Sequence, residues 1–294
     1  MAGLVVEFPN GIQEVLEKGA EYSSPFMANG TTQGVQWGKN EIYVVKGVKP
    51  GFKSANGGNK SYGPNQDTEK IIVKAEELDL GFRVSIHEME EAKEKGVWNQ
   101  LLATRIKENL KETMSVIDYA IVTGRDEVSG NPIPFYQTVN GNFIQGVQNV
   151  ITPSSSPSKD IRDGRALLKR FKNTKNIASI QGFTDLYDEV DKTKLVQLGA
   201  DLSVMGVKVE ETDAISDPVK YIGGDWSKFR WGIRPLSNGL EMVETGDPDN
   251  KGTDLKYMDE VYFRSKILVV WCITHPEAFF IVRNDSTEEE QIEG

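Results

Sequence analysis

The chain has two histidines, and neither stands in a pattern that supports metal catalysis. His87 is followed by Glu88, but Glu91 occupies the position where the H-E-x-x-H zinc motif requires its second histidine. Ser156 and Lys159 match the S-x-x-K pattern of β-lactamases, but the companion S-D-N and K-T-G patterns are missing from the sequence. The sequence therefore predicts neither a zinc protease nor a serine acyl-transfer site.

A glycine-rich segment, residues 47–65, imitates a phosphate-binding loop without completing one. Asn59 separates Gly58 from Lys60, whereas the phosphate-binding motif places glycine directly before lysine. The segment also lacks a following helix whose N-terminus would hold an anion. The sequence therefore predicts no nucleotide site in this segment.

A second segment begins like a calcium-binding loop. Asp247, Asp249 and Gly252 have the spacing of its first, third and sixth residues. Lys251 occupies a ligand position, however, and Met258 stands where the closing glutamate is required. With no complete set of ligands, bases or phosphate-binding groups, the sequence predicts no metal, no cofactor and no enzyme.

Composition and charge restrict the class of protein further. The 294 residues are 38% hydrophobic and 27% charged, which is ordinary for a folded protein. The formal net charge is −10, which disfavours tight binding to nucleic acid because that affinity comes largely from basic groups on phosphates. No apolar run approaches the ~20 residues of a membrane span, and the N-terminus lacks a secretory signal. We therefore expect a cytoplasmic origin and no membrane partner.

The elements that would position functional residues begin with a hairpin. The runs Glu41–Lys46 and Lys70–Lys74 are rich in β-branched residues and predict two paired strands. The tip between them, residues 47–65, has too few apolar side chains to fold alone, so it is expected to lie on a neighbouring copy. The tip residues predicted to make this contact are Lys49, Phe52, Lys53, Lys60 and Tyr62.

A long amphipathic helix follows the hairpin. Ser85 and Glu88 have the spacing of a capping box, which predicts a short helix that Gly96 interrupts. A second helix is predicted over 98–123, with Gly124 as its stop. Its apolar residues recur every three or four positions, which indicates one buried face. They are Leu102, Ile106, Leu110, Met114, Ile117 and Ile121.

The remainder of the chain reads as a mixed α/β region followed by strands. We predict a helix capped by Ser158, a helix over Thr184–Leu198 and an acidic, solvated loop over Gly246–Asp259. The tail Asp285–Gly294 is acidic and poor in apolar residues, so it is predicted to be a solvated extension. The predicted strands are one within Phe143–Ile151, then Ile177–Ile180, Val204–Val209, Val219–Gly223, Trp231–Pro235, Leu240–Val243, Val261–Val270 and Ala278–Val282. Cys272 lies in the apolar run Ile267–Ile273, which is typical of a buried thiol.

These features, in this order, resemble the major capsid proteins of tailed phages of the Hong Kong 97 type. The resemblance covers nearly the whole chain, and its strength lies in the order and spacing of the segments. They are LGFRVSIHEMEEA (80–92), IDYAIVTG (117–124), MGVKVEETDAI (205–215), YIGGDWSKFRWGIR (221–234) and VYFRSKILVVWCITHPEAFFIV (261–282).

The resemblance implies an α+β, Hong Kong 97-like capsid fold and a division of the chain. A peripheral domain would hold the long "spine" helix, and an axial α/β domain would face the symmetry axes of a shell. The implied parts are an N-terminal extended arm (1–29), an extended hairpin arm (30–80, tip 47–65), the peripheral domain (81–157, spine helix 98–123), the axial domain (158–259), C-terminal strands that return to the peripheral domain (260–284) and the acidic tail (285–294).

The function that the resemblance implies is structural. The chain would assemble with itself, as hexamers and pentamers, into the icosahedral head of a tailed phage, in the host bacterial cytoplasm. A separate scaffolding protein and a portal protein would be partners, and the shell would enclose double-stranded DNA without sequence-specific binding. Two alternatives stay open: an encapsulin-like compartment that packages a protein cargo, and an unrelated soluble enzyme or ligand-binding protein.

Overall fold

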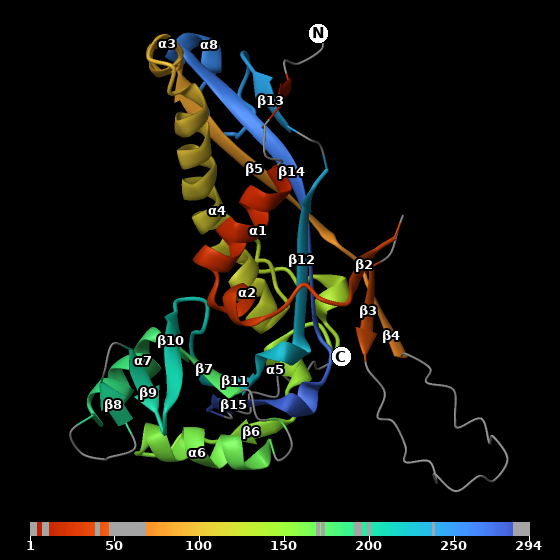
Figure 1. The fold of residues 1–294 in the computed structure, drawn as a ribbon, viewed down its shortest axis with the longest axis vertical. Helices are drawn as coiled ribbons and strands as arrows, with labels where there is room; N and C mark the ends of the chain where they lie inside the picture. The colour runs from red at the N-terminus through yellow and green to blue at the C-terminus, as the bar shows by residue number, and fades with distance from the viewer. Residues whose placement is uncertain are drawn as a thin grey trace, which may run out of the picture.

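The computed structural model describes residues 5–7, 12–38, 42–46, 69–168, 171, 174–190, 196–198, 201–236 and 239–284. The strands form three sheets, of five, seven and three strands. Figure 1 shows an elongated molecule in which the five-stranded sheet and a long helix run side by side, the seven-stranded sheet forms a compact unit at one end, and the small sheet projects to the side. We call the five-stranded sheet with the long helix the long-sheet unit, and the seven-stranded sheet with its helices the compact unit.

The long-sheet unit is built around β14 (Glu260–Ile273), the longest strand described. On one edge β14 pairs antiparallel with β5 (Glu76–Ser85) from Glu260 opposite Ser85 to Val269 opposite Glu76. Its other edge is shared by two strands, which pair with its two halves. These are β13 (Gly239–Val243) and β12 (Phe229–Pro235), and β1 (Val5–Glu7) extends the sheet beyond β13.

The helix α4 (Trp98–Thr123) has the bounds that the apolar repeat predicts. Its six repeat residues, from Leu102 to Ile121, are each at most 1% exposed, because this face packs against the sheet and the N-terminal helix. The opposite face carries exposed lysine and glutamate residues. Gly124 ends the helix with a φ of 69°, a left-handed conformation that favours glycine.

The short helix α3 (Ile86–Glu94) precedes α4. Of the predicted capping box, the hydrogen bond to the Ser85 side chain forms. Ser85 Oγ accepts a hydrogen bond from the Glu88 amide at 3.1 Å. The Glu88 carboxylate, however, is bonded to Arg105 of α4 at 3.1 Å. This ion pair fastens α3 to α4.

The N-terminal region is helical where the sequence analysis expected an extended arm. Within residues 1–29, α1 (Ile12–Ser23) and α2 (Pro25–Asn29) are helices, and Leu16, Phe26 and Met27 are buried in the main core. The extended-arm prediction is therefore wrong for these helices. Helix α1 lies directly on α4, where a Cβ on Gly19 would stand 2.7 Å from Leu110 Cδ1, so glycine permits the close approach.

The compact unit is a mixed sheet with helices packed on it. Its strand order is β6-β15-β11-β7-β10-β9-β8. Helices α6 (Pro157–Leu167) and α7 (Ile180–Tyr187) cover it (Figure 1). The strands are β6 (Asn149–Ile151), β7 (Thr174–Ser179), β8 (Val196–Leu198), β9 (Leu202–Val204), β10 (Val207–Thr212), β11 (Val219–Asp225) and β15 (Phe279–Arg283).

Two predicted elements of the compact unit are wrong. The predicted helix over Thr184–Leu198 corresponds to α7, which ends at Tyr187, and to the strand β8. The single strand predicted over Val204–Val209 is a hairpin of β9 and β10. Its turn holds Met205 and Gly206 at positive φ, 53° and 74°, a geometry that a simple pattern of apolar residues does not reveal.

One further prediction near the start of this unit is confirmed and another needs correction. The one strand predicted within Phe143–Ile151 is β6, and it is preceded by α5 (Phe143–Gly146), a helical turn capped by Asn142. The helix predicted to begin at Ser158 begins at Pro157, so Ser156 holds the cap position. Proline is favoured at the first helical position because its missing amide has no partner there.

The predicted division of the chain differs from the sheet topology. Strands β12 and β13 fall within 158–259 but belong to the five-stranded sheet. Strand β15 falls within 260–284 but belongs to the compact unit, between β6 and β11. The chain therefore crosses between the units more often than a division into consecutive segments allows.

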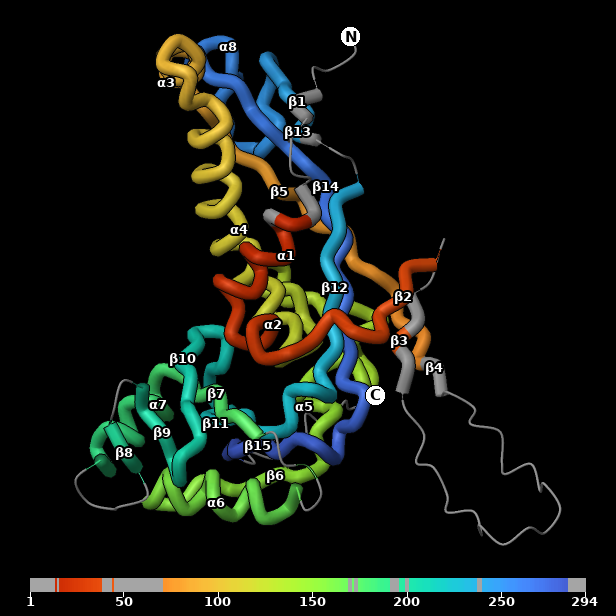
Figure 2. The backbone as a smooth tube through the Cα atoms, viewed as in Figure 1, coloured from red at the N-terminus to blue at the C-terminus, as the bar shows by residue number. Residues whose placement is uncertain are grey.

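The third sheet carries the predicted hairpin. Strands β3 (Ile42–Lys46) and β4 (Glu69–Val73) pair antiparallel, as the sequence predicts, and β2 (Val35–Trp37) adds a third strand. The guanidinium of Arg234 in β12 lies 4.5 Å from the Trp37 ring centroid, which ties this sheet to the long-sheet unit. In Figure 2 the sheet stands to one side of the main body. The predicted tip residues lie outside the described residues.

We predict that Leu110→Asp prevents the subunit from folding stably. Leu110 is completely buried, and an aspartate there would be an unpaired charge in the core. The expected loss is about 4 kcal/mol or more of unfolding free energy. Chemical denaturation followed by circular dichroism measures it, with Lys107→Asp, on the exposed face of α4, as the matched control. Equal stability of the two variants would contradict the packing described here.

Candidate functional site

The residues that the motif search singled out do not meet in one site. His87 is exposed on α3, and Lys159 is exposed on α6. Across the described part of the chain, no group of three or more His, Cys, Asp or Glu side chains is arranged to hold a metal ion. In the same part, no helix is both long enough and apolar enough to cross a membrane. Several surfaces, and the contacts that hold them in place, are candidate functional regions.

One such contact surrounds Arg83 of β5. Its side chain is only 10% exposed and donates to Asp247 Oδ1 at 3.1 Å and Asp249 Oδ2 at 2.9 Å. It also donates to Thr253 Oγ1 at 2.8 Å and Glu260 Oε2 at 3.1 Å. The calcium-like loop therefore encloses a guanidinium group. The prediction of a solvated loop is wrong for this part of Gly246–Asp259.

The Arg83 cluster is electrostatically favourable. The hydrogen bond from Arg83 lowers the pKa of Asp249, so the carboxylate stays ionised under neutral conditions. Because the pKa is lowered in the folded state, the interaction stabilises the folded loop at pH values above the ordinary carboxyl pKa. This stabilisation is lost as pH falls through the lowered pKa. We infer that the loop is held firmly at neutral pH and is released in acid.

The Arg83 cluster positions an exposed apolar tip. Helix α8 (Leu255–Met258) follows the loop, with Leu255 buried and with Tyr257 and Met258 exposed by 88% and 52%. Asp254 caps this helix through the amide of Lys256. Figure 1 places α8 beside α3 at the end of the long sheet that lies farthest from the compact unit. This end therefore presents an aromatic side chain on a fixed support.

The compact unit has its own exposed apolar side chains. Three of them lie on the end of α7, on β8 and in the turn between β9 and β10, at the outer part of this unit (Figure 1). They are Tyr187 (46% exposed), Leu198 (56%) and Met205 (44%). The long-sheet and compact units thus each expose apolar residues at the end remote from the other unit.

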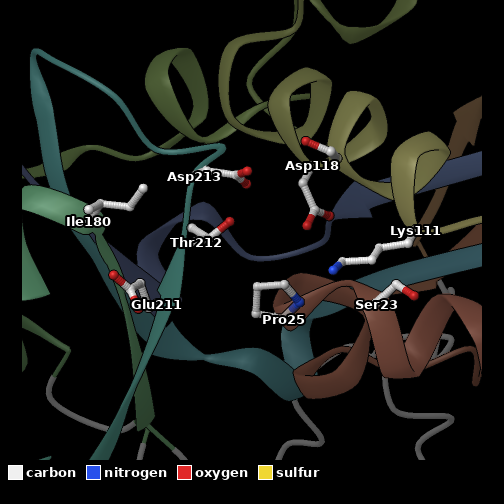
Figure 3. Close-up of a pocket in the computed structure, with 9 residues that line it drawn as sticks. Ser23, Pro25, Lys111, Asp118, Ile180, Glu211, Thr212 and Asp213 are labelled. Atoms are coloured by element: carbon white, nitrogen blue, oxygen red, sulfur yellow. The ribbon is translucent and has the colours of Figure 1, made fainter. Parts of the chain in front are cut away.

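A cavity of about 370 Å³ lies where the two units and the N-terminal helices meet. Figure 3 shows Asp118 and Lys111 reaching into it from α4, opposite Thr212 and Asp213 at the end of β10. Asp118 is 3% exposed and accepts a hydrogen bond from Ser24 Oγ at 2.5 Å. Sequence analysis did not identify this junction, because Asp118 falls among the apolar residues of α4 without a distinguishing pattern.

We predict that Arg83→Ala loosens the loop 246–259. The variant leaves the carboxylates of Asp247, Asp249 and Glu260 without their shared cation, so its thermal unfolding midpoint should fall and hydrogen exchange in the loop should accelerate. The matched control is Arg264→Ala, which breaks one exposed ion pair with Glu241 and should have a much smaller effect. A smaller fall in the unfolding midpoint and a smaller rise in loop exchange for Arg83→Ala than for the control would contradict the proposed role of the cluster.

No family model matches the sequence, and no curated protein matches it. Solved structures do share its fold. A structure from Mycobacterium phage Ogopogo is similar with a TM-score of 0.59 and 17% identity, covering 89% of this chain and 92% of that chain. The satellite phage P4 procapsid has a TM-score of 0.53 and 10% identity, with coverages of 92% and 99%. The virus-like particle from Pyrococcus furiosus has a TM-score of 0.51 and 10% identity, with coverages of 94% and 100%.

These likenesses extend over about nine-tenths of the chain, so they concern the whole fold and not one motif. The chain has the phage major capsid protein fold, which is the fold that the sequence resemblance predicts.

Proposed function

We propose that the chain is the major capsid protein of a tailed, double-stranded DNA bacteriophage. Copies of it would assemble as hexamers and pentamers into an icosahedral head, and the mature location would be the virion. The observation that carries the proposal is the fold, which a phage procapsid shares over 92% of this chain. The role is structural, and we assign no catalytic residues.

The proposal assigns contacts between copies to three surfaces. The first is the sheet β2-β3-β4 with the tip 47–65, including Lys49, Phe52, Lys53, Lys60 and Tyr62. The second is α8 with Tyr257 and Met258, and the third is the outer part of the compact unit. In Figure 1 the sheet β2-β3-β4, α8 and the outer part of the compact unit lie in different directions from the middle of the molecule, which supports contacts of one subunit with several neighbours. Many repeated interfaces of this kind would close a shell.

Charge supports enclosure of DNA without tight binding. The formal net charge of −10 repels a polyphosphate, so packaged DNA would not adhere to the shell wall. A scaffolding protein and a portal protein are further proposed partners, with assembly in the cytoplasm of the host bacterium. In the proposal, Leu102, Ile106, Leu110, Met114, Ile117 and Ile121 form the core of a spine helix and do not contact neighbours.

A compartment that packages protein is the second candidate. A virus-like particle from Pyrococcus furiosus has a similar fold, which supports a shell of this kind, but its TM-score of 0.51 is below the 0.59 of the Ogopogo structure. The two functions differ in what the particles contain. Ultraviolet absorbance of particles purified from infected or expressing cells, at the nucleic-acid and protein maxima, separates DNA-filled shells from protein-filled ones.

We predict that deleting Val48–Pro64 leaves a folded subunit that no longer closes shells. The tip has little apolar surface to contribute to its own core, whereas the proposal gives it contacts with neighbours. Circular dichroism and thermal unfolding should be unchanged, while sedimentation and electron microscopy should show loss of closed particles.

The control for this deletion replaces the same residues with a Gly/Ser linker of equal length. If the side chains of the tip make the contacts, the linker variant also fails to assemble. Closed particles of normal diameter from both variants, or loss of folded secondary structure in either, would contradict the assigned role of the tip.

A further inference from the structure

A groove lies between helix α1 and helix α4 on the surface of the long-sheet unit. It encloses about 690 Å³, and its described lining residues all belong to these two helices. Tyr22, near the end of α1, stands at its rim and is 95% exposed. In Figure 1 the two helices lie against each other above the compact unit. The groove is therefore open to solvent and accessible to a segment of chain.

The groove is basic, although the chain as a whole is acidic. Lys18 of α1 and Lys107 and Lys111 of α4 line it, and among its described lining residues Glu14 is the one carboxylate. Glu14 pairs with Lys18 at 2.6 Å, so these two charges cancel. Lys107 and Lys111 are exposed, and neither has an ion-pair partner within the described part of the chain. Two ammonium groups thus remain for a ligand with negative charge.

The groove is continuous with the cavity where the two units meet, which we call the junction cavity. Ser23 and Lys111 line both spaces. Figure 3 shows these two residues on one side of the junction cavity and Asp213 on the other. Asp213 is the first residue after β10, in the loop that leads to β11. This loop therefore borders a path that leads to the lysines of the groove.

The C-terminal segment leaves the described structure beside the same loop. The amide of Asn284, which follows β15, donates to the Pro218 carbonyl at 3.0 Å. Pro218 lies five positions after Asp213, so at most about 18 Å separates these residues. Residues 285–294 reach up to about 35 Å when extended. The segment is therefore long enough to cross the junction cavity and reach Lys111.

We propose that the acidic segment Asp285–Gly294 lies in the groove between α1 and α4 of the same chain. The segment has five carboxylate side chains and no basic residue, which complements the ammonium groups of Lys107 and Lys111. Ion pairs at a groove surface stay hydrated and need no apolar core, so this docking agrees with the polar composition of the segment. The inference concerns the single subunit and does not depend on the proposed shell function.

The charges along the path favour the groove over the junction cavity. Asp118, Glu211 and Asp213 line the junction cavity but not the groove, and their carboxylates repel an acidic segment. After Asp285 the segment continues with uncharged serine and threonine, and the run Glu288–Glu290 follows. The uncharged residues can cross the acidic part of the path, and the glutamates then meet the lysines beyond it.

Crosslinking of the isolated subunit with a carbodiimide, followed by digestion and mass spectrometry, tests the docking. The reagent joins a carboxylate directly to an amine that it contacts, so glutamates of 285–294 should be linked to Lys107 or Lys111. The control is Lys159, which is exposed on α6 of the compact unit. Links to the groove lysines should exceed links to Lys159 by about fivefold, the preference that two exposed ion pairs supply. This excess should disappear at about 1 M salt, where exposed charges are screened.

Acetylation of the lysines gives a second, independent measurement. In a chain truncated after Asn284, Lys107 and Lys111 should be acetylated about fivefold faster than in the natural chain, because the segment no longer covers them. Reversing the charge of Glu288, Glu289 and Glu290 to lysine keeps the length of the segment and should have the same effect. Lys159 should react equally in all three proteins, and circular dichroism should show that all three are folded.

A mixture of ¹⁵N-labelled and unlabelled subunits shows whether each link lies within one copy. The proposal predicts links within one copy. Equal linking of Lys159 and the groove lysines, links only between copies, or unchanged acetylation of Lys107 and Lys111 after truncation would overturn it.

Discussion

The structure depends on a cluster of aromatic rings buried where its two larger sheets and its N-terminal helices meet. Trp226 lies at the centre, with its ring centroid 5.3 Å from Phe279, 5.4 Å from Phe143 and 5.7 Å from Phe26. These residues come from the N-terminal, middle and C-terminal parts of the chain, and Phe229 of β12 packs beside them. Removing this much apolar surface from water fixes the relative positions of segments that no local interaction connects.

The aromatic cluster explains how a chain that crosses repeatedly between two units forms one framework. Phe229 begins β12 of the long-sheet unit, and Phe279 begins β15 of the compact unit, so the cluster anchors a strand of each sheet. Helix α2 is fixed on the same cluster by Phe26 and by the hydrogen bond from Trp231 Nε1 to the Met27 carbonyl at 3.0 Å. The extremities of the molecule, including α8 and the hairpin strands, then project from a rigid centre. The proposed role as a shell subunit would need such a centre, because the contacts of a subunit must be presented in fixed directions.

Local patterns predicted the elements whose causes are local. The spacing from Leu102 to Ile121 and the stop at Gly124 gave the bounds of α4, and β-branched runs predicted the pairing of β3 with β4. The helix α1 was missed because the first residues were interpreted through the family resemblance as an extended arm. The hairpin turn at Met205 was not predicted, because a positive φ favours glycine and the sequence has methionine at this position.

The contacts that matter most for the candidate site could not be read from the sequence, because their partners lie far apart along the chain. Arg83 meets Asp249 across 166 positions, and Ser24 meets Asp118 across 94. Neither pair has a motif, and each forms only when the sheet and α4 bring the side chains together. The acidic loop was therefore expected to be solvated, although an arginine of β5 holds it against the long sheet.

A reconstruction by cryo-electron microscopy of particles formed by the full chain tests the proposed shell function most directly. The account predicts closed shells in which the sheet β2-β3-β4 of each copy lies against a neighbouring copy and the compact units meet around the symmetry axes. Particles whose hairpin sheets face only solvent, or a chain that stays monomeric under conditions where it is fully folded, would contradict it.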